Sequence, residues 1–201
     1  MAITAIRVVF GAAGIVAVGA LTPGPNNLIV LERAARRGFG SAVPAIAAIT
    51  CGSVALILAV GSAGAVMFEG RHWLRAAVSV GGCAYLSWLG LRLLVKASDE
   101  SPAPSRLWPD TTWKLFVFQF MNPKAWAIAL TASAALEEYR SLGTALLELA
   151  MLFAVIPAAC LLLWSAAGAA LAKYLQHSHI RLMFERLLGV LLLGSAVAVV
   201  L

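Results

Sequence analysis

Two short clusters of proline and asparagine interrupt apolar stretches of the chain, about half a chain apart. The first is Thr22-Pro23-Gly24-Pro25-Asn26-Asn27, and the second is Asn122-Pro123-Lys124. Proline has no amide hydrogen, so each cluster frees backbone carbonyls that a continuous helix would satisfy. Inside lipid, such groups are tolerated only where they line a buried cavity or bind a ligand. The paired interruptions therefore predict one binding site built from two broken helices.

The residue types in these clusters suit a polar or zwitterionic ligand. Gly24 permits a close approach to the backbone, and the amides of Asn26, Asn27 and Asn122 can both donate and accept hydrogen bonds. The helix that restarts after Pro25 presents free N–H groups that favour a carboxylate. The alternative is that the prolines only kink two packed helices.

Two ionisable residues fall inside apolar segments, where a charge needs a partner or a function. A charge at the middle of a membrane helix costs roughly 2.5 to 3.5 kcal/mol. Lys124 is predicted either to contact the substrate or to pair with Glu148. Glu148 is also a candidate to carry a coupling proton, and the alternative is that its side chain reaches the outer membrane surface.

The sequence predicts no metal, cofactor or enzyme site. His177 and His179 form a His-x-His pair without cysteine or carboxylate neighbours, which a solvated loop explains better than a metal site. The three cysteines are far apart and lie in apolar segments, so they indicate neither a disulfide framework nor a metal centre. The sequence contains no hydrolase, nucleotide-binding or dinucleotide-binding motif. A transporter with this sequence must therefore be driven by a transmembrane gradient.

Composition places these residues in a membrane. Of the 201 residues, 62% are hydrophobic and 12% are charged, whereas soluble domains carry about a quarter charged residues. The net charge of +6 does not indicate nucleic-acid binding, because the basic residues form short clusters between apolar runs. The first apolar run continues past the prolines to Leu31, so we expect it to span the membrane rather than to be a cleaved signal peptide.

The expected fold is an all-α integral membrane protein with one transmembrane domain over residues 1–201. Charged and turn-forming residues separate six expected spans, at 8–31, 41–68, 73–95, 115–136, 142–172 and 182–201. A polar, proline-containing linker at about 97–111 divides two repeats, at about 1–96 and 112–201. Each repeat has an odd number of spans, so similar repeats must enter the membrane from opposite sides. The prediction is two inverted three-helix repeats with helices 1 and 4 broken.

Lysine and arginine predict the orientation. Leaving out Lys124, ten of these residues fall in or beside connections one, three and five, and four fall at the N-terminus and connections two and four. Because cytoplasmic loops retain positive charge, both termini are expected outside. The ten are Arg33, Arg36, Arg37, Arg92, Lys96, Arg106, Lys114, Lys173, Arg181 and Arg186, and the four are Arg7, Arg71, Arg75 and Arg140.

Four segments match a known family pattern: the two proline clusters, the segment Gly82-Cys83-Ala84-Tyr85-Leu86-Ser87-Trp88-Leu89-Gly90, and Leu188-Gly189 in the last helix. On these segments the chain resembles the LysE/RhtB family of bacterial amino-acid export proteins over nearly its full length. The resemblance implies a six-helix inner-membrane protein that moves amino acids or their derivatives outward against protons. It places substrate contacts on Pro23, Gly24, Pro25, Asn26, Asn27, Asn122, Pro123 and Lys124.

Four residues depart from the family pattern without touching the proline clusters. Ala48 and Ser53 stand where relatives often have glycine and an acidic or polar residue, and Leu115 and Gln119 stand where glycine and asparagine are usual. The change on the second helix weakens a proton-coupling role there, which makes Glu148 the candidate for that role.

The expected function is secondary export of amino acids or amino-acid derivatives across the bacterial inner membrane. The expected partners are a small amino-acid substrate and the lipid bilayer, without nucleic acid or a cofactor. The alternative is a non-transporting membrane scaffold or assembly subunit, whose broken helices would pack against a partner. The sequence leaves open which amino acid is carried and whether the chain forms a homo-oligomer.

Overall fold

The structure, a computed structural model, describes residues 2–68, 72–96, 109, 111–134, 141–175 and 177–200. Over these residues the chain is all-helical, with eight α-helices, two short 3-10 helices and no strands. The first half holds α1 (Ala2–Leu21), α2 (Pro25–Arg37), η1 (Phe39–Ala42), α3 (Val43–Phe68) and α4 (His72–Lys96). The second half holds α5 (Thr112–Phe118), η2 (Gln119–Met121), α6 (Pro123–Ala134), α7 (Leu142–Leu171) and α8 (Ser178–Val200).

Helix breaks occur at both proline clusters, as predicted. Gly24 is extended, with φ −165° and ψ 174°, and α2 restarts at Pro25, a position where the missing amide hydrogen costs nothing. The part of α1 from Phe10 onward and α2 are bent by 49° at this break. In the second half, η2 tightens the end of α5, Asn122 is extended, and α6 restarts at Pro123.

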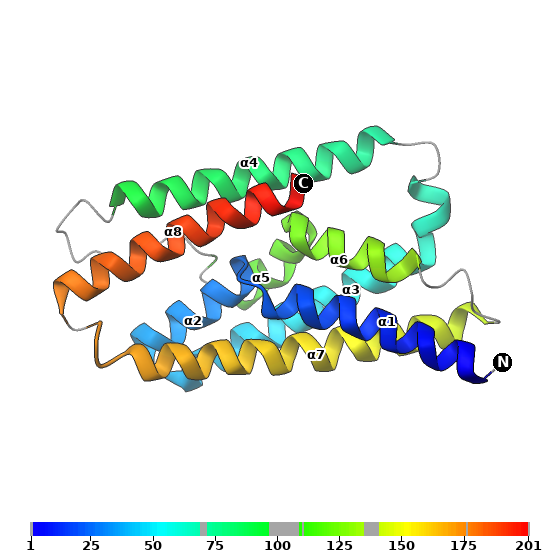
Figure 1. Cartoon of the computed structure of the whole chain (residues 1–201), viewed down its shortest axis with the longest axis horizontal. Coiled ribbons are helices and arrows are strands. Elements are labelled where there is room, and N and C mark those ends of the chain that lie inside the picture. The colour runs from blue at the N-terminus through cyan, green and yellow to red at the C-terminus, as the bar shows by residue number, and fades with distance from the viewer. Residues whose placement is uncertain are drawn as a thin grey trace.

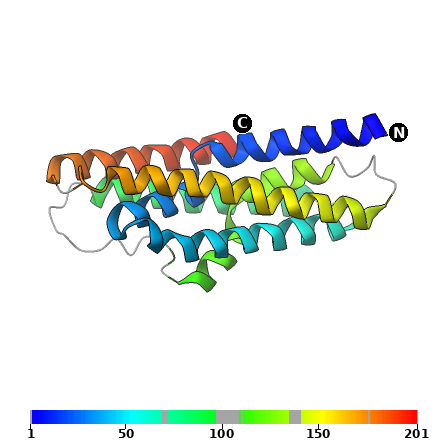
Figure 2. The same cartoon turned by 90° about the horizontal axis from the view of Figure 1, so that it is seen from below.

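The long helices lie side by side along the longest axis of the molecule (Figures 1 and 2). The C-terminal ends of α2, α4 and α7 and the start of α8 lie at one end, on the left in Figure 1. The starts of α1, α4 and α7 lie at the opposite end. The basic residues Arg36, Arg37, Arg92, Lys173 and Arg181 belong to segments at the left-hand end, which we call the arginine-rich end.

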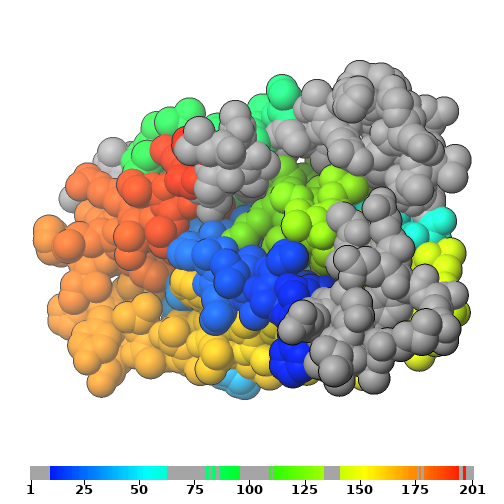
Figure 3. Space-filling view, turned by 45° about the vertical axis from the view of Figure 1, so that its right-hand side comes forward, coloured from blue at the N-terminus to red at the C-terminus, as the bar shows by residue number. Residues whose placement is uncertain are grey.

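Packing follows a crossed pattern between the halves. Both α1 and α2 pack on α7, both α5 and α6 pack on α3, and α3 also packs on α7. The helices α4 and α8 pack on each other (Figure 1). The space-filling view shows the α1–α2 segment flanked by α6 on one side and α7 on the other (Figure 3). The broken helices are therefore held by the second helix of the opposite half.

Glycines allow the closest of these contacts. A side-chain carbon added at Gly90 of α4 would lie 2.9 Å from the Gly189 carbonyl oxygen of α8, and one at Gly189 would lie 2.9 Å from the Gly90 oxygen. These glycines belong to two of the segments that carry the family resemblance. At Gly168 of α7 the added carbon would collide with the backbone of Leu31 in α2.

By length and apolar composition, two helical segments of the described chain could cross a membrane. They are Phe39–Ser62 and Leu142–Leu171. The bent pair Phe10–Leu21 and Pro25–Arg37 would make three if it is one span. The protein is thus an all-helical membrane protein with two to three candidate spans by this measure.

Candidate functional site

A small cavity lies where the two breaks meet the middle of α3 and α7. Its volume is about 50 Å³, enough for a water molecule or two. The polar side chains that line it are Asn26, Asn27, Ser53, Asn122 and Lys124. The large apolar side chains that line it are Val16, Leu56, Ile128, Phe153, Pro157 and Leu161. The cavity therefore has a polar part, made by the breaks, and an apolar part, made by the surrounding helices.

The first break presents backbone carbonyls, and several of them accept hydrogen bonds from side chains. The Thr22 hydroxyl donates to the Val18 and Gly19 oxygens, both at 3.0 Å. The Asn27 amide nitrogen Nδ2 donates to the Ala20 oxygen at 2.8 Å and to the Thr22 oxygen at 2.9 Å. Asn27 is buried, so its amide replaces the backbone N–H groups that the extended segment cannot supply.

A lysine side chain from the second break contacts the backbone of the first break. Lys124, in the first turn of α6, donates from Nζ to the Thr22 oxygen at 2.6 Å and to the Pro23 oxygen at 3.1 Å. Its backbone N–H donates to the Asn122 Oδ1 atom at 3.1 Å, so Asn122 caps the restarted helix. The ammonium group sits beyond the C-terminus of α1, where the helix dipole favours positive charge.

An amide cluster joins the two breaks. Asn26 Nδ2 donates to Gln119 Oε1 at 2.8 Å, and Gln119 Nε2 donates back to Asn26 Oδ1 at 3.1 Å. The Asn122 amide reaches the same Asn26 oxygen at 3.4 Å. Gln119 also donates to the Leu115 oxygen and is completely buried. Because buried polar groups must be paired, this cluster fixes the position of α2 against η2.

Both restarted helices point their first turns at the cavity region. The first N–H groups of any helix have no acceptor within that helix, and in α6 the N–H of Lys124 is already taken by Asn122 Oδ1. Such N–H groups and the positive end of the helix dipole favour a carboxylate. The site thus combines carbonyl acceptors for a cation with two helix N-termini for an anion.

Six of the eight predicted contact residues line the cavity: Gly24, Pro25, Asn26, Asn27, Asn122 and Lys124. Pro23 contributes its carbonyl oxygen to Lys124. Pro123 is buried and does not line the cavity; it sets the first position of α6.

Glu148 is not brought to this site. It lies on an exposed face of α7, next to the buried Leu149, and does not line the cavity. The Lys124 ammonium group donates to the Thr22 and Pro23 oxygens. A proton-coupling role for Glu148 stays a prediction of the sequence.

The sequence did not identify Gln119, Phe153 or Pro157 as site residues. Gln119 was noted only as a departure from the family pattern, although a polar residue three positions before Asn122 in an apolar segment is itself a signal. Phe153 and Pro157 lie one helical turn apart on α7 and line the apolar part of the cavity. No pattern in that uniformly apolar helix separates its cavity face from its lipid face.

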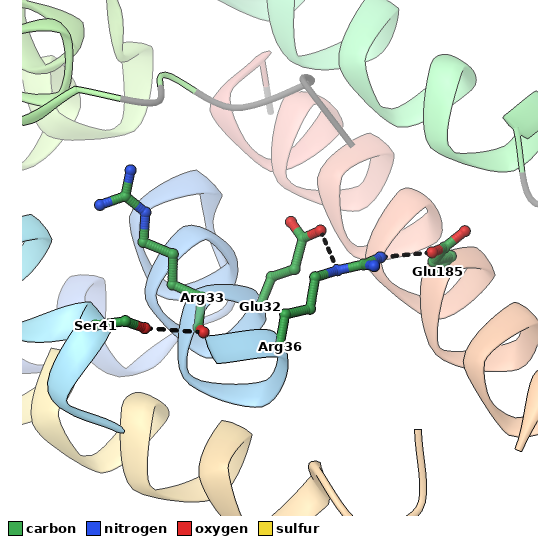
Figure 4. Close-up of polar contacts among 5 residues, drawn as sticks. All are labelled: Glu32, Arg33, Arg36, Ser41 and Glu185. Atoms are coloured by element: carbon green, nitrogen blue, oxygen red, sulfur yellow. Dashed lines mark hydrogen bonds and ion pairs between the residues drawn. The ribbon is translucent and has the colours of Figure 1, made fainter. Parts of the chain in front are cut away.

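A second polar cluster lies at the arginine-rich end. Arg36 of α2 lies between two carboxylates, with Nε 2.8 Å from Glu32 Oε1 and a terminal nitrogen 2.6 Å from Glu185 Oε1 (Figure 4). Glu32 is buried, and Glu185 belongs to α8. The Ser41 hydroxyl donates to the Arg33 oxygen at 3.1 Å (Figure 4). The ion pairs therefore tie α2 to α8 at this end.

Among the residues that the structure describes, no group of three or more His, Cys, Asp or Glu side chains could hold a metal ion. His177 and His179 are both exposed.

Comparison with known proteins gives a consistent result. A profile of the LysE type translocator family matches residues 17–201. A cysteine/O-acetylserine efflux protein of Salmonella choleraesuis (strain SC-B67) is 32% identical over 115 residues, which are 56% of this chain and 57% of that relative. The protein of the same name from Escherichia coli (strain K12) is 30% identical over 122 residues, with the same coverage.

The match thus spans little more than half the length of these curated relatives. No solved structure was found to match the chain. The family profile, in contrast, covers most of the sequence and includes both proline clusters and the glycines of α4 and α8. Its members are translocators rather than enzymes. The chain therefore belongs to the LysE type translocator family.

Proposed function

We propose that the protein is a secondary transporter that exports amino acids or amino-acid derivatives across the bacterial inner membrane, in exchange for protons. The observation that carries the proposal is the shared cavity, which is lined by asparagine amides from both breaks and by Lys124, whose ammonium group donates to the Thr22 and Pro23 carbonyls at the first break. Broken helices at the centre of a transporter are a recurrent way to bind polar substrates.

We further propose six spans arranged as two inverted repeats, at about 1–96 and 112–201. Reciprocal contacts support this arrangement. Gly90 meets Gly189 and Leu193, while Gly189 meets Gly90 and Leu94, four residues further along each helix. The crossed packing of α1 and α2 on α7 and of α5 and α6 on α3 supports it as well.

The orientation follows from charge. Because the arginine-rich end gathers basic residues from α2, α4, α7 and α8, we place it on the cytoplasmic side and both termini outside. The ion pairs between Arg36, Glu32 and Glu185 then lie at the cytoplasmic end of the bundle.

The site supports binding of a zwitterion. The substrate carboxylate would lie at the N-termini of α2 and α6, and the α-ammonium would lie at the carbonyls of Thr22 and Pro23. The substrate side chain would occupy the apolar part of the cavity, beside Ile128 and Phe153. This favours a small neutral side chain, in keeping with the cysteine and O-acetylserine named for the relatives.

The cavity must widen before it can hold such a substrate. Ligand pockets usually measure roughly 300 to 1,000 Å³, whereas this cavity measures about 50 Å³. We therefore assign the structure to a closed conformation of the transporter. Alternating access would open the breaks first toward one side of the membrane and then toward the other.

Counterflow in proteoliposomes tests the proposal. Purified protein is reconstituted with unlabelled amino acid inside, and uptake of labelled cysteine, O-acetylserine, serine, leucine, lysine and glutamate is measured. We expect exchange of the small neutral amino acids and its loss in Asn26→Leu and Asn122→Leu when exchange is counted per folded molecule. If no amino acid exchanges in well-inserted protein, the exporter proposal is wrong. If the folded fraction of both variants exchanges as the unaltered protein does, their role is structural, as for a scaffold subunit.

A further inference from the structure

In this structure the Lys124 ammonium group lies on two backbone carbonyl oxygens that would also suit a substrate's ammonium group. Its Nζ lies 2.6 Å from the Thr22 oxygen and 3.1 Å from the Pro23 oxygen. Both carbonyls belong to the segment that ends α1, next to Gly24, where the chain is extended. An α-ammonium group has the same charge and the same three donors as the lysine side chain. The two groups therefore compete for the same two oxygens.

Among the residues that the structure describes, no carboxylate lines the cavity, so no lining group neutralises a second cation there. Lys124 carries the one ionisable side chain among the described residues that line it. The lining residues from the packed helices α1, α2, α3 and α7 are apolar, amide or hydroxyl residues. Two ammonium groups within about 4 Å of each other repel strongly in a medium of low dielectric constant. Lys124 must therefore move away or lose its charge when the substrate's ammonium arrives.

We propose that Lys124 is the proton carrier of the exporter, and that its ammonium group and that of the substrate occupy the Thr22 and Pro23 carbonyls alternately. The proposal rests on the proposed function. When substrate binds from the cytoplasm, an N–H bond of Lys124 breaks and the proton passes to cytoplasmic water, leaving a neutral amine. After the substrate leaves on the outer side, the amine takes a proton from outer water and returns to the carbonyls. One zwitterion moves out for each proton that moves in.

The remaining contacts keep the break formed while Lys124 is displaced. The Asn27 amide holds the Ala20 and Thr22 oxygens independently of Lys124. The amide pair of Asn26 and Gln119 holds α2 against η2. The exchange of one ammonium for another therefore leaves the carbonyl site in place.

Proton release on binding tests the proposal directly. Reduced L-cysteine is added at pH 7 to purified protein in weakly buffered detergent solution, and released protons are counted against bound cysteine. We expect about one proton per bound molecule from the unaltered protein and none from Lys124→Gln, whose amide is never charged. We expect Lys124→Arg to bind cysteine at least tenfold more weakly, because a guanidinium group stays charged.

Transport measurements supply the second test. In proteoliposomes, Lys124→Gln should reduce the accumulation of cysteine driven by an imposed pH gradient by a much larger factor than it reduces cysteine counterflow in the same vesicles. Glu148→Gln is the matched comparison, since Glu148 is the rival candidate; it should keep pH-driven accumulation. Binding without proton release, or loss of pH coupling in Glu148→Gln but not in Lys124→Gln, would overturn the proposal. A different result would overturn the proposed function itself: no counterflow of any amino acid in the unaltered protein. Should Lys124→Gln not fold, the proton count on the unaltered protein still decides.

Discussion

The two breaks are equivalent in position but differ in charge. Each restarted helix has proline at its first position and a polar residue at its second, Asn26 in α2 and Lys124 in α6. The side chain of each of these second residues forms hydrogen bonds with the other break. Asn26 pairs with Gln119 and Asn122, whereas Lys124 reaches the carbonyls of Thr22 and Pro23.

The two contacts between the breaks therefore suit different roles. The contact between Asn26 and Gln119 is a neutral amide pair whose hydrogen bonds are satisfied within the protein, so it suits a fixed structural role. The contact made by Lys124 places a cation on the Thr22 and Pro23 carbonyls, which could instead accept hydrogen bonds from a ligand's ammonium group. A pair of similar breaks thus becomes a site with one permanent contact and one exchangeable contact.

The largest effect on stability and transport is expected when the amide pair of Asn26 and Gln119 is removed. Asn26→Leu leaves the buried Gln119 amide without its main partner, which costs about 1 to 3 kcal/mol of stability. Transport should fall at least tenfold. Thermal unfolding and counterflow on the same preparation measure both effects.

The double variant Asn26→Leu with Gln119→Leu separates structure from function. Replacing both partners by apolar residues should restore much of the stability, while transport stays low because the amide that bounds the cavity is gone. Recovery of full transport in the double variant would show that the amide pair only supports the fold.

A smaller effect is expected from crowding the second break. A side-chain carbon at Gly52 of α3 would lie 2.7 Å from the Phe116 carbonyl oxygen and 2.6 Å from Gln119 Cγ. The backbone oxygen cannot move aside easily, so Gly52→Ala should destabilise the protein by about 1 to 3 kcal/mol. Gly81→Ala, where nothing lies within 4 Å, is the control. Equal unfolding temperatures for the two variants would contradict the packing described here.

Crowding the first break should affect transport more than stability. A side-chain carbon at Gly24 would lie 2.9 Å from the Lys124 Cδ and Nζ atoms, which belong to a flexible side chain. Gly24→Ala should therefore displace the ammonium group, lower transport roughly three- to tenfold and change stability by less than about 0.5 kcal/mol. The control is Gly14→Ala in α1, which meets no neighbour within 4 Å. Unchanged transport in Gly24→Ala would argue against a working role for this contact.

The smallest effect on transport is expected at the arginine-rich end, because its ion pairs do not line the cavity. Glu185→Gln removes one partner of a partly exposed ion pair, worth up to about 1 kcal/mol. Arg36→Gln should cost more, because the Glu32 carboxylate is buried and loses its arginine. Urea unfolding of both variants measures this order. A larger loss in Glu185→Gln than in Arg36→Gln would reverse it.

The sequence predicted the breaks and the limits of some helices because prolines and charged connections mark them locally. The predicted span 73–95 differs from α4 by one residue at each end, and 142–172 differs from α7 by one residue at its end. The spans 8–31 and 182–201 begin six and four residues after the starts of α1 and α8, because these helices already include Arg7 and Arg181, the charged residues that precede the two spans. The breaks lie at the predicted prolines for the same reason. Pairing the two breaks across about 100 residues was possible only because the two halves repeat one pattern.

The partners within the site could not be predicted. Substrate contact by Lys124 stays a prediction, and its ammonium group donates to carbonyl oxygens, which carry no sequence signal. Glu148 and the adjacent Leu149 lie on differently exposed faces of α7. Because that helix is apolar on all sides, the sequence does not show which face meets the protein.

The most direct test of the account compares ligands that lack one end of the zwitterion. Binding of cysteine, N-acetylcysteine and cysteine methyl ester to purified protein is measured by the shift in thermal unfolding temperature. The account predicts that free cysteine stabilises the protein and that both derivatives bind at least tenfold more weakly, because one end would lose the carbonyls and the other would lose the helix N-termini. Equal stabilisation by cysteine and N-acetylcysteine would contradict the claim that the first break holds the substrate's ammonium group.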